Sequence, residues 1–143
     1  MTGLTDDQHL DRARALVSDA YHYLGLAITG GGAGRVEVTL TVREELLNAD
    51  GVLHGGMWAV VADSAMGGAL RTMLDPEVER AVTAQLDIRW LRPAQGATLR
   101  AAGRLTRRGR MLSHCSADLF DVRDELVGTA TATFVVVRRD EPD

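Results

Sequence analysis

The sequence has 143 residues, 45% of them hydrophobic, which predicts a single domain over residues 1–143 with a substantial apolar core. The net charge of −4 and the scattered aromatic residues argue against a nucleic-acid partner. A lone cysteine, Cys115, excludes an intramolecular disulfide and a cysteine-rich zinc site, and no metal is implied. The first residues do not form a basic segment followed by an apolar one, so we expect no secretory signal, no membrane association and a cytoplasmic protein.

An amphipathic helix is predicted near the N-terminus, over about residues 5–22. Thr5 and Gln8 have the spacing of a capping box, and apolar residues follow at helical intervals. Gly25 is expected to end this helix.

Two strands are predicted next, over residues 24–29 and 35–42, with a glycine-rich run at 30–34 between them. The run lacks the Gly-x-Gly-x-x-Gly spacing of a nucleotide-binding loop, because Arg35 stands where the last glycine is needed. A strand also follows where such a loop requires a helix. We therefore predict a hairpin connection.

A long helix is predicted over about residues 55–72, because the chain there is proline-free and almost wholly apolar. Apolar residues lie on all its sides, which is typical of a helix buried within a wrapped sheet or at a subunit interface. Asp63 is the exception, since an ionised carboxylate is costly to bury without partners. At the helix start, Gly55 and Gly56 leave backbone N–H groups open to an oxygen anion. The alternative is a tight entry turn at the glycines and a salt-bridged core residue at Asp63.

Four further strands are predicted in the second half of the chain. Residues 82–90 alternate between apolar and polar, with Val82, Ala84, Leu86, Ile88 and Trp90 on the apolar face. The other three cover residues 97–106, 111–121 and 125–137, with short turns between them. One long helix and an antiparallel sheet of five or six strands indicate an α+β fold.

Two motifs carry a family resemblance. Asn48-x-x-Gly51-x-x-His54-Gly55-Gly56, with Asp63 in the following helix, and the segment 82–94 resemble the hotdog-fold acyl-CoA thioesterases of the phenylacetate-pathway (PaaI-like) type. The resemblance extends over residues 24–137 in order of elements. It implies a sheet wrapped around the central helix, hydrolysis of aryl or medium-chain acyl-CoA, and no cofactor, because coenzyme A is part of the substrate.

The resemblance also implies roles for individual residues. The Gly55 N–H would polarise the thioester carbonyl, and Asn48 would orient the substrate. Asp63 would be the general base or the nucleophile. Thr83 stands where the family often has serine and would hold the attacking water, while His54 would contact the thioester or shape its loop.

Substrate binding is assigned to further residues. Gly56 shares the open helix start with Gly55, and a predicted hairpin tip carries three arginines suited to the CoA phosphates, namely Arg107, Arg108 and Arg110. The alternative for the arginines is a solvated turn.

The spacing between Gly56 and Asp63 predicts more than one subunit. Seven residues of helix place Asp63 about 10 Å further along the axis, whereas catalysis requires contacts near ~3 Å. Each site should therefore combine the glycine end of one helix with Asp63 of a neighbouring chain. We expect a homodimer, which in this family often assembles into a tetramer.

Three other classes of function compete with this interpretation. Hydratase or dehydratase chemistry on the same fold is disfavoured, because it normally uses a catalytic histidine and an acidic partner in a differently spaced motif, which the chain lacks. A serine hydrolase is disfavoured, because the chain has no Gly-x-Ser-x-Gly motif. The remaining alternative is a non-catalytic hotdog module that binds acyl-CoA or an acyl-carrier protein.

Overall fold

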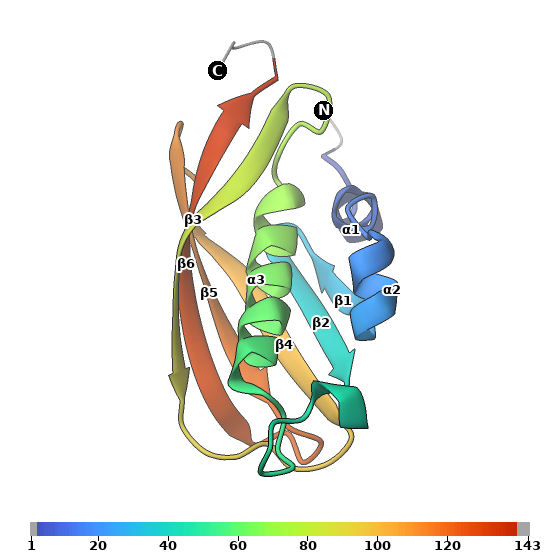
Figure 1. The fold of residues 1–143 in the computed structure, drawn as a ribbon. Helices are drawn as coiled ribbons and strands as arrows, with labels where there is room; N and C mark the ends of the chain where they lie inside the picture. Colours follow the sequence, from blue (N-terminus) through green and yellow to red (C-terminus); the bar gives the residue numbers. More distant parts are fainter. Residues whose placement is uncertain (1–2, 140–143) are drawn as a thin grey trace.

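The computed structural model describes residues 3–139, and its main feature is a long helix held in the curve of a six-stranded antiparallel sheet (Figure 1). The elements are α1 (Asp6–Arg14), α2 (Asp19–Leu24), β1 (Leu26–Gly32), β2 (Arg35–Thr41), a short 3-10 helix η1 (Glu44–Leu46), α3 (Gly55–Arg71), β3 (Glu79–Trp90), β4 (Thr98–Arg107), β5 (Leu112–Phe120) and β6 (Leu126–Arg138). This architecture confirms the predicted α+β hotdog fold. In the part of the chain from residue 3 to 139, no helix combines the length and apolarity needed to cross a membrane.

The strand order in the sheet is β1-β2-β4-β5-β6-β3. The hairpin between β1 and β2 and the consecutive antiparallel pairing of β4, β5 and β6 agree with the sequence prediction. The strand β3 instead pairs with β6 at the far edge, so the chain crosses the sheet between β3 and β4. This edge position leaves one side of β3 without a neighbouring strand.

The predicted single N-terminal helix is wrong in its extent, because α1 and α2 are separate. The capping box of Thr5 and Gln8 is present, but α1 ends in a tight turn where the Leu16 N–H donates to the Ala13 carbonyl. Ser18 then stands at the N-cap of α2, a position that serine favours. The expected end at Gly25 is confirmed, since its φ of +78° is the left-handed conformation that suits glycine.

The core lies between α3 and the concave face of the sheet. Gly103 of β4 lets the two approach closely, because a Cβ atom there would lie 2.4 Å from the backbone carbonyl of Ala65. The prediction that α3 is buried on every side is only partly correct for a single chain. One stripe stays partly exposed, formed by Ala59, Val60, Asp63, Ser64, Gly67 and Arg71.

A β-bulge in β3 breaks the predicted alternation. Thr83 pairs with Phe134, but the next paired residue is Gln85, so Ala84 is an extra residue. Before the bulge Thr83 faces α3, and after it Leu86 and Ile88 pack against the core. Strict alternation would have placed Thr83 on the opposite face from those two residues.

Candidate active site

The loop before α3 is fixed by the side chain of Asn48. Its Oδ1 accepts hydrogen bonds from the backbone N–H of Asp50 at 3.0 Å and of Val52 at 3.2 Å. The His54 N–H donates to the Leu46 carbonyl at 2.9 Å and closes the loop. The oxygen of Asn48 is therefore committed to the loop, and its amide NH₂ is the group left for a ligand.

His54 is the N-cap of α3. Its Nδ1 accepts a hydrogen bond from the Gly56 N–H at 2.9 Å, so the ring proton of the neutral imidazole is on Nε2. Within residues 3–139, the Gly55 N–H has no acceptor. Of the two N–H groups expected to be open, only that of Gly55 is available to an incoming oxygen.

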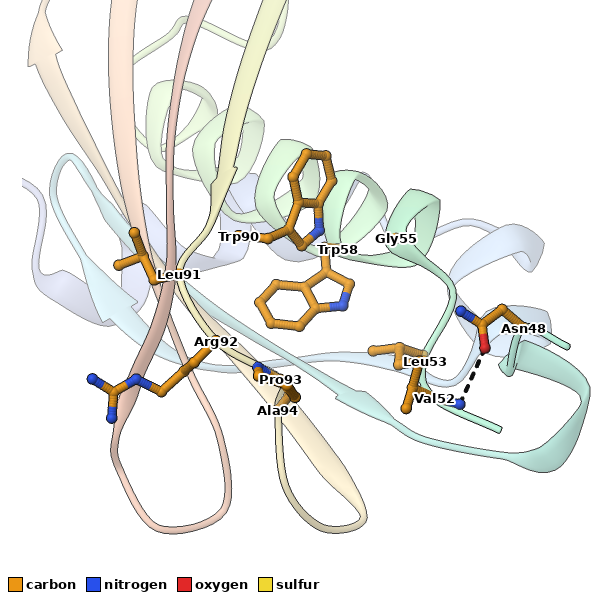
Figure 2. Close-up of a pocket in the computed structure, with 10 residues that line it drawn as sticks. All are labelled: Asn48, Val52, Leu53, Gly55, Trp58, Trp90, Leu91, Arg92, Pro93 and Ala94. Atoms are coloured by element: carbon orange, nitrogen blue, oxygen red, sulfur yellow. Dashed lines mark hydrogen bonds between the residues drawn. The ribbon is translucent and has the colours of Figure 1, made fainter. Parts of the chain in front are cut away.

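The Gly55 N–H lies beside a cavity of about 440 Å³ with two indole rings in its wall (Figure 2). Trp58 comes from α3 and Trp90 from the end of β3. A Cβ atom at Gly55 would lie 3.8 Å from the Trp90 ring, so this indole covers the start of the helix. We call this space the Gly55 cavity. Its wall is completed by Asn48, Val52, Leu53, Leu91, Arg92, Pro93 and Ala94.

Asp63 is held by the neighbouring strand. The Thr83 hydroxyl donates a hydrogen bond of 2.8 Å to Asp63 Oδ1. Among the described residues of this single chain Asp63 forms no ion pair and is only half-buried, which argues against the alternative of a salt-bridged core residue. The bond joins α3 to β3 and leaves Oδ2 free of partners within the same residues.

A tyrosine from the N-terminal region closes the Asp63 environment. Burial raises the pKa of Tyr21, a hydrogen bond with Ser64 opposes this, and the negative charge of Asp63 adds to the rise. The phenol is therefore neutral at physiological pH, and it stands next to the carboxylate as a hydrogen-bonding group without charge.

Asp63 lines a second cavity of about 180 Å³, which we call the Asp63 cavity. It shares no residue with the Gly55 cavity. Its wall is formed by Leu16, Tyr21, Asp63, Ser64, Gly67, Gly68, Arg71, Ala81, Thr83 and Phe134. Within one chain, the open N–H and the carboxylate thus face different spaces, as their helical spacing predicted.

The three predicted phosphate-binding arginines are at the other end of the sheet. Arg107 ends β4, and Arg108 and Arg110 lie in the turn between β4 and β5, beside the start of β3, whereas Gly55 lies beside the end of β3. Arg108 is already engaged, with its Nη2 donating to Glu79 Oε1 at 2.6 Å. Arg107 and Arg110 stay predicted phosphate ligands, and a single chain does not bring them to Gly55.

The other potentially reactive residues, Cys115 and His114, have structural roles. Burial raises the pKa of Cys115 to about 12, so its thiol is not a nucleophile at neutral pH. His114 points elsewhere, with its Nδ1 bonded to the Thr133 hydroxyl at 3.2 Å. Over residues 3–139, no group of three His, Cys, Asp or Glu side chains is arranged to hold a metal ion.

The family follows from comparison with known proteins. The family model described as the thioesterase superfamily matches residues 50–128, more than half of the chain, and includes Gly55, Asp63 and Thr83. The chain belongs to the thioesterase superfamily. It is a thioester hydrolase, which favours the enzyme over the non-catalytic binding module.

Relatives of this thioesterase support the assignment. A provisionally named esterase of Halobacterium salinarum is 30% identical over 67% of this chain and 68% of its own length. A solved structure from Ralstonia eutropha JMP134, described as a provisional thioesterase related to phenylacetic acid degradation, is 31% identical. It covers 89% of this chain and 98% of that one, with a TM-score of 0.78. The Escherichia coli PaaI protein shares the fold, with a TM-score of 0.81, 23% identity and coverage of 93% and 94%.

Sequence reasoning missed several residues around these cavities. Trp90 was assigned to an apolar strand face, Tyr21 to an amphipathic helix, and Arg71 was not considered. Arg71 follows Asp63 by two successive steps of four residues, so helical spacing alone could have placed both on one face. Tyr21 had no such signal, because its contact with Ser64 depends on how α2 folds back on α3.

Proposed function

We propose that this thioesterase hydrolyses aryl or medium-chain acyl-CoA to the free acid and CoA. The observation that carries the proposal is the open Gly55 N–H at a helix N-terminus, inside a cavity with aromatic walls, together with a carboxylate anchored by Thr83. The relation of the Ralstonia eutropha neighbour to phenylacetic acid degradation supports an aryl acyl group.

The chemistry uses the two groups on opposite sides of the thioester. The Gly55 N–H donates to the carbonyl oxygen and stabilises the negative charge that develops there. Asp63 removes a proton from water while the water oxygen attacks the carbonyl carbon. The C–S bond then breaks, and the sulfur leaves as a thiolate that accepts the proton from Asp63. In the nucleophilic variant Asp63 attacks the carbonyl carbon first, the C–S bond breaks with release of the CoA thiolate, and water then cleaves the resulting anhydride to the free acid and the Asp63 carboxylate. Neither route requires a cofactor, and turnover in the presence of a chelator tests this.

The supporting groups have distinct tasks in this proposal. Thr83 holds the Asp63 carboxylate in position and can accept a hydrogen bond from the attacking water. The Asn48 NH₂ group and the Nε2 proton of His54 are donors available to the substrate. His54 also keeps the Gly56 N–H occupied, which leaves Gly55 as the donor for the carbonyl.

The active site in this proposal is shared by two chains of a homodimer. Eight residues of helix separate Gly55 from Asp63 by about 12 Å, too far for both to contact one thioester carbon. The exposed stripe of α3 and the unpaired edge of β3 supply surface that a second copy can cover. A tetramer built from two such dimers is compatible with the proposal.

A mixed dimer tests the shared site. The Gly55→Pro variant removes the N–H, a donor whose loss costs about 3 kcal/mol in comparable sites, and proline is tolerated in the first turn of a helix. Asp63→Asn removes the base, and kcat should fall by about a hundredfold or more. Each variant should be folded but nearly inactive. Their heterodimer contains one site with both defects and one with neither, so it should recover about half the wild-type rate.

The heterodimer is isolated with two different affinity tags, and native mass spectrometry verifies its composition. CoA release from phenylacetyl-CoA is followed with a thiol reagent. A heterodimer as inactive as its parents would refute the shared site. If the wild type binds acyl-CoA but releases no CoA from any acyl group, the non-catalytic module would be the correct function.

A further inference from the structure

The Asp63 cavity contains a positive charge as well as a negative one. Asp63, Gly67 and Arg71 succeed each other at intervals of four residues, so they lie along one face of α3. Asp63 and Arg71 are about 12 Å apart along the helix axis. Gly67 lies between them and has no side chain to block the path. The cavity therefore joins the reacting end of the site to a guanidinium group.

Apolar side chains form part of the wall between the two charges. Leu16 and the ring of Tyr21 come from the N-terminal segment, Ala81 comes from β3, and Phe134 comes from β6. The Phe134 ring lies 3.5 Å from where a Cβ of Gly67 would stand. These side chains give the methylene groups of an acyl chain an apolar surface to contact on the way from Asp63 to Arg71.

The charge on Arg71 has no described partner. No ion pair or hydrogen bond of its guanidinium occurs within residues 3–139. Burial lowers the pKa of Arg71, and the positive charge of Arg139 lowers it further. The guanidinium stays protonated nonetheless, since arginine is always charged in proteins. A partly desolvated cation beside a second cation is an environment that favours an anion.

We propose that Arg71 selects acyl groups that carry a carboxylate at the end remote from the thioester. This inference rests on the proposed function, because it places the acyl group in the Asp63 cavity with its carbonyl near Asp63. The preferred substrates are then CoA monothioesters of short dicarboxylic acids. The guanidinium binds the distal carboxylate with a pair of charge-assisted hydrogen bonds.

Two other roles for Arg71 predict different behaviour. A cation in the last turn of α3 also stabilises the helix C-terminus, in which case its loss lowers stability and leaves substrate preference unchanged. A contact with a CoA phosphate would affect all acyl-CoA substrates alike. Substrate pairs that differ only in the distal group separate these roles.

The test compares adipoyl and hexanoyl thioesters, which differ in having a carboxylate or a methyl group at the far end. Both acyl groups are offered on CoA and on N-acetylcysteamine, which has no phosphate. Wild-type kcat/KM should be higher for the adipoyl member of each pair. Arg71→Gln should lower the adipoyl-to-hexanoyl ratio by about ten- to hundredfold on either carrier, as expected for loss of a charged hydrogen bond. The kcat/KM for hexanoyl-CoA should be unchanged, which also shows that the variant is folded.

Two further variants sharpen the result. Arg71→Lys keeps the charge and should restore part of the adipoyl preference. Arg139→Gln removes the neighbouring cation, which does not line the cavity, and should keep the ratio within about twofold of wild type. An equal loss in both glutamine variants would mean that a diffuse positive field acts and would overturn the contact proposed for Arg71.

The remaining outcomes decide between this inference and the proposed function. A wild-type ratio near one with active turnover would overturn the inference and leave the proposed function intact. An equal loss on both CoA substrates, absent with N-acetylcysteamine, would reassign Arg71 to a CoA phosphate. Binding of free adipate and hexanoate to Asp63→Asn, measured by calorimetry, does not depend on turnover. If Asp63→Asn binds adipate more tightly than hexanoate, and the double variant Asp63→Asn/Arg71→Gln does not, the inference is supported. This result would hold even if Asp63 proved not to be catalytic.

Discussion

Replacing Thr83 by valine should weaken catalysis without unfolding the protein. Valine matches threonine in shape and removes only the hydroxyl that donates to Asp63 Oδ1 at 2.8 Å. A hydrogen bond to a charged group contributes about 1.5–3 kcal/mol, which corresponds to about 10- to 150-fold in rate. Thr83 and Asp63 are both open to solvent, so water can replace part of the bond. We therefore expect the lower end, a decrease in kcat of about tenfold.

The assay is steady-state release of CoA, with KM and the thermal midpoint measured in parallel. Thr83→Ser is the matched control, because it keeps the hydroxyl, and its kcat should stay within about threefold of wild type. Wild-type kcat in the valine variant would refute the reasoning that the strand positions the carboxylate. A loss of the same size in both variants would point to packing of the methyl group instead.

Two predictions concern stability. Gly103→Ala places a Cβ 2.4 Å from the Ala65 carbonyl and should lower the free energy of unfolding by about 1–3 kcal/mol or more, measured by urea denaturation. The control is Gly30→Ala, whose Cβ would have its nearest atom at 3.7 Å and which should change the free energy of unfolding much less. Burial alone would raise the pKa of Asp121, but three backbone N–H donors and the charge of Arg123 lower it. The stabilising contribution is therefore present above the unfolded carboxyl pKa of about 3.9 and is lost as the pH falls through the lower folded value. The thermal midpoint of Asp121→Asn should lie below that of the wild type at pH 7, and the difference between the two midpoints should shrink as the pH falls toward 3. A difference that stayed constant down to pH 3 would contradict this.

The sequence predicted those parts of the fold that depend on local pattern. The central helix, the first hairpin and the meander of β4, β5 and β6 follow from periodicity and turn residues. The break between α1 and α2 was missed, because Leu16 and Val17 continue the apolar pattern through it. The position of β3 at the far edge was missed too, since pairing with β6 is a long-range choice that no local signal specifies.

The candidate site was predictable to a similar extent. Family motifs identified Gly55, Asp63 and Thr83, and the structure adds the contact between the last two. The capture of Gly56 by His54 was not foreseen, because it depends on the orientation of one imidazole ring. Arg71 was overlooked, since an arginine near a helix C-terminus is ordinary and only the cavity makes it notable.

The bulge at Ala84 divides β3 into two segments with different roles. Upstream, the residues facing α3 serve the site, whereas downstream they serve the core. Deleting Ala84 would remove the bulge and leave Thr83 and Leu86 two residues apart, a spacing that regular alternation places on one face, so the contact of Thr83 with Asp63 and the packing of Leu86 should both be kept. The extra residue is therefore not needed to keep the two segments in phase, and its structural effect is the local bend and twist that a bulge adds to a strand. In a directed-evolution library, deletion of Ala84 should therefore survive about as often as substitutions there, whereas deletion of Leu86 should be lost.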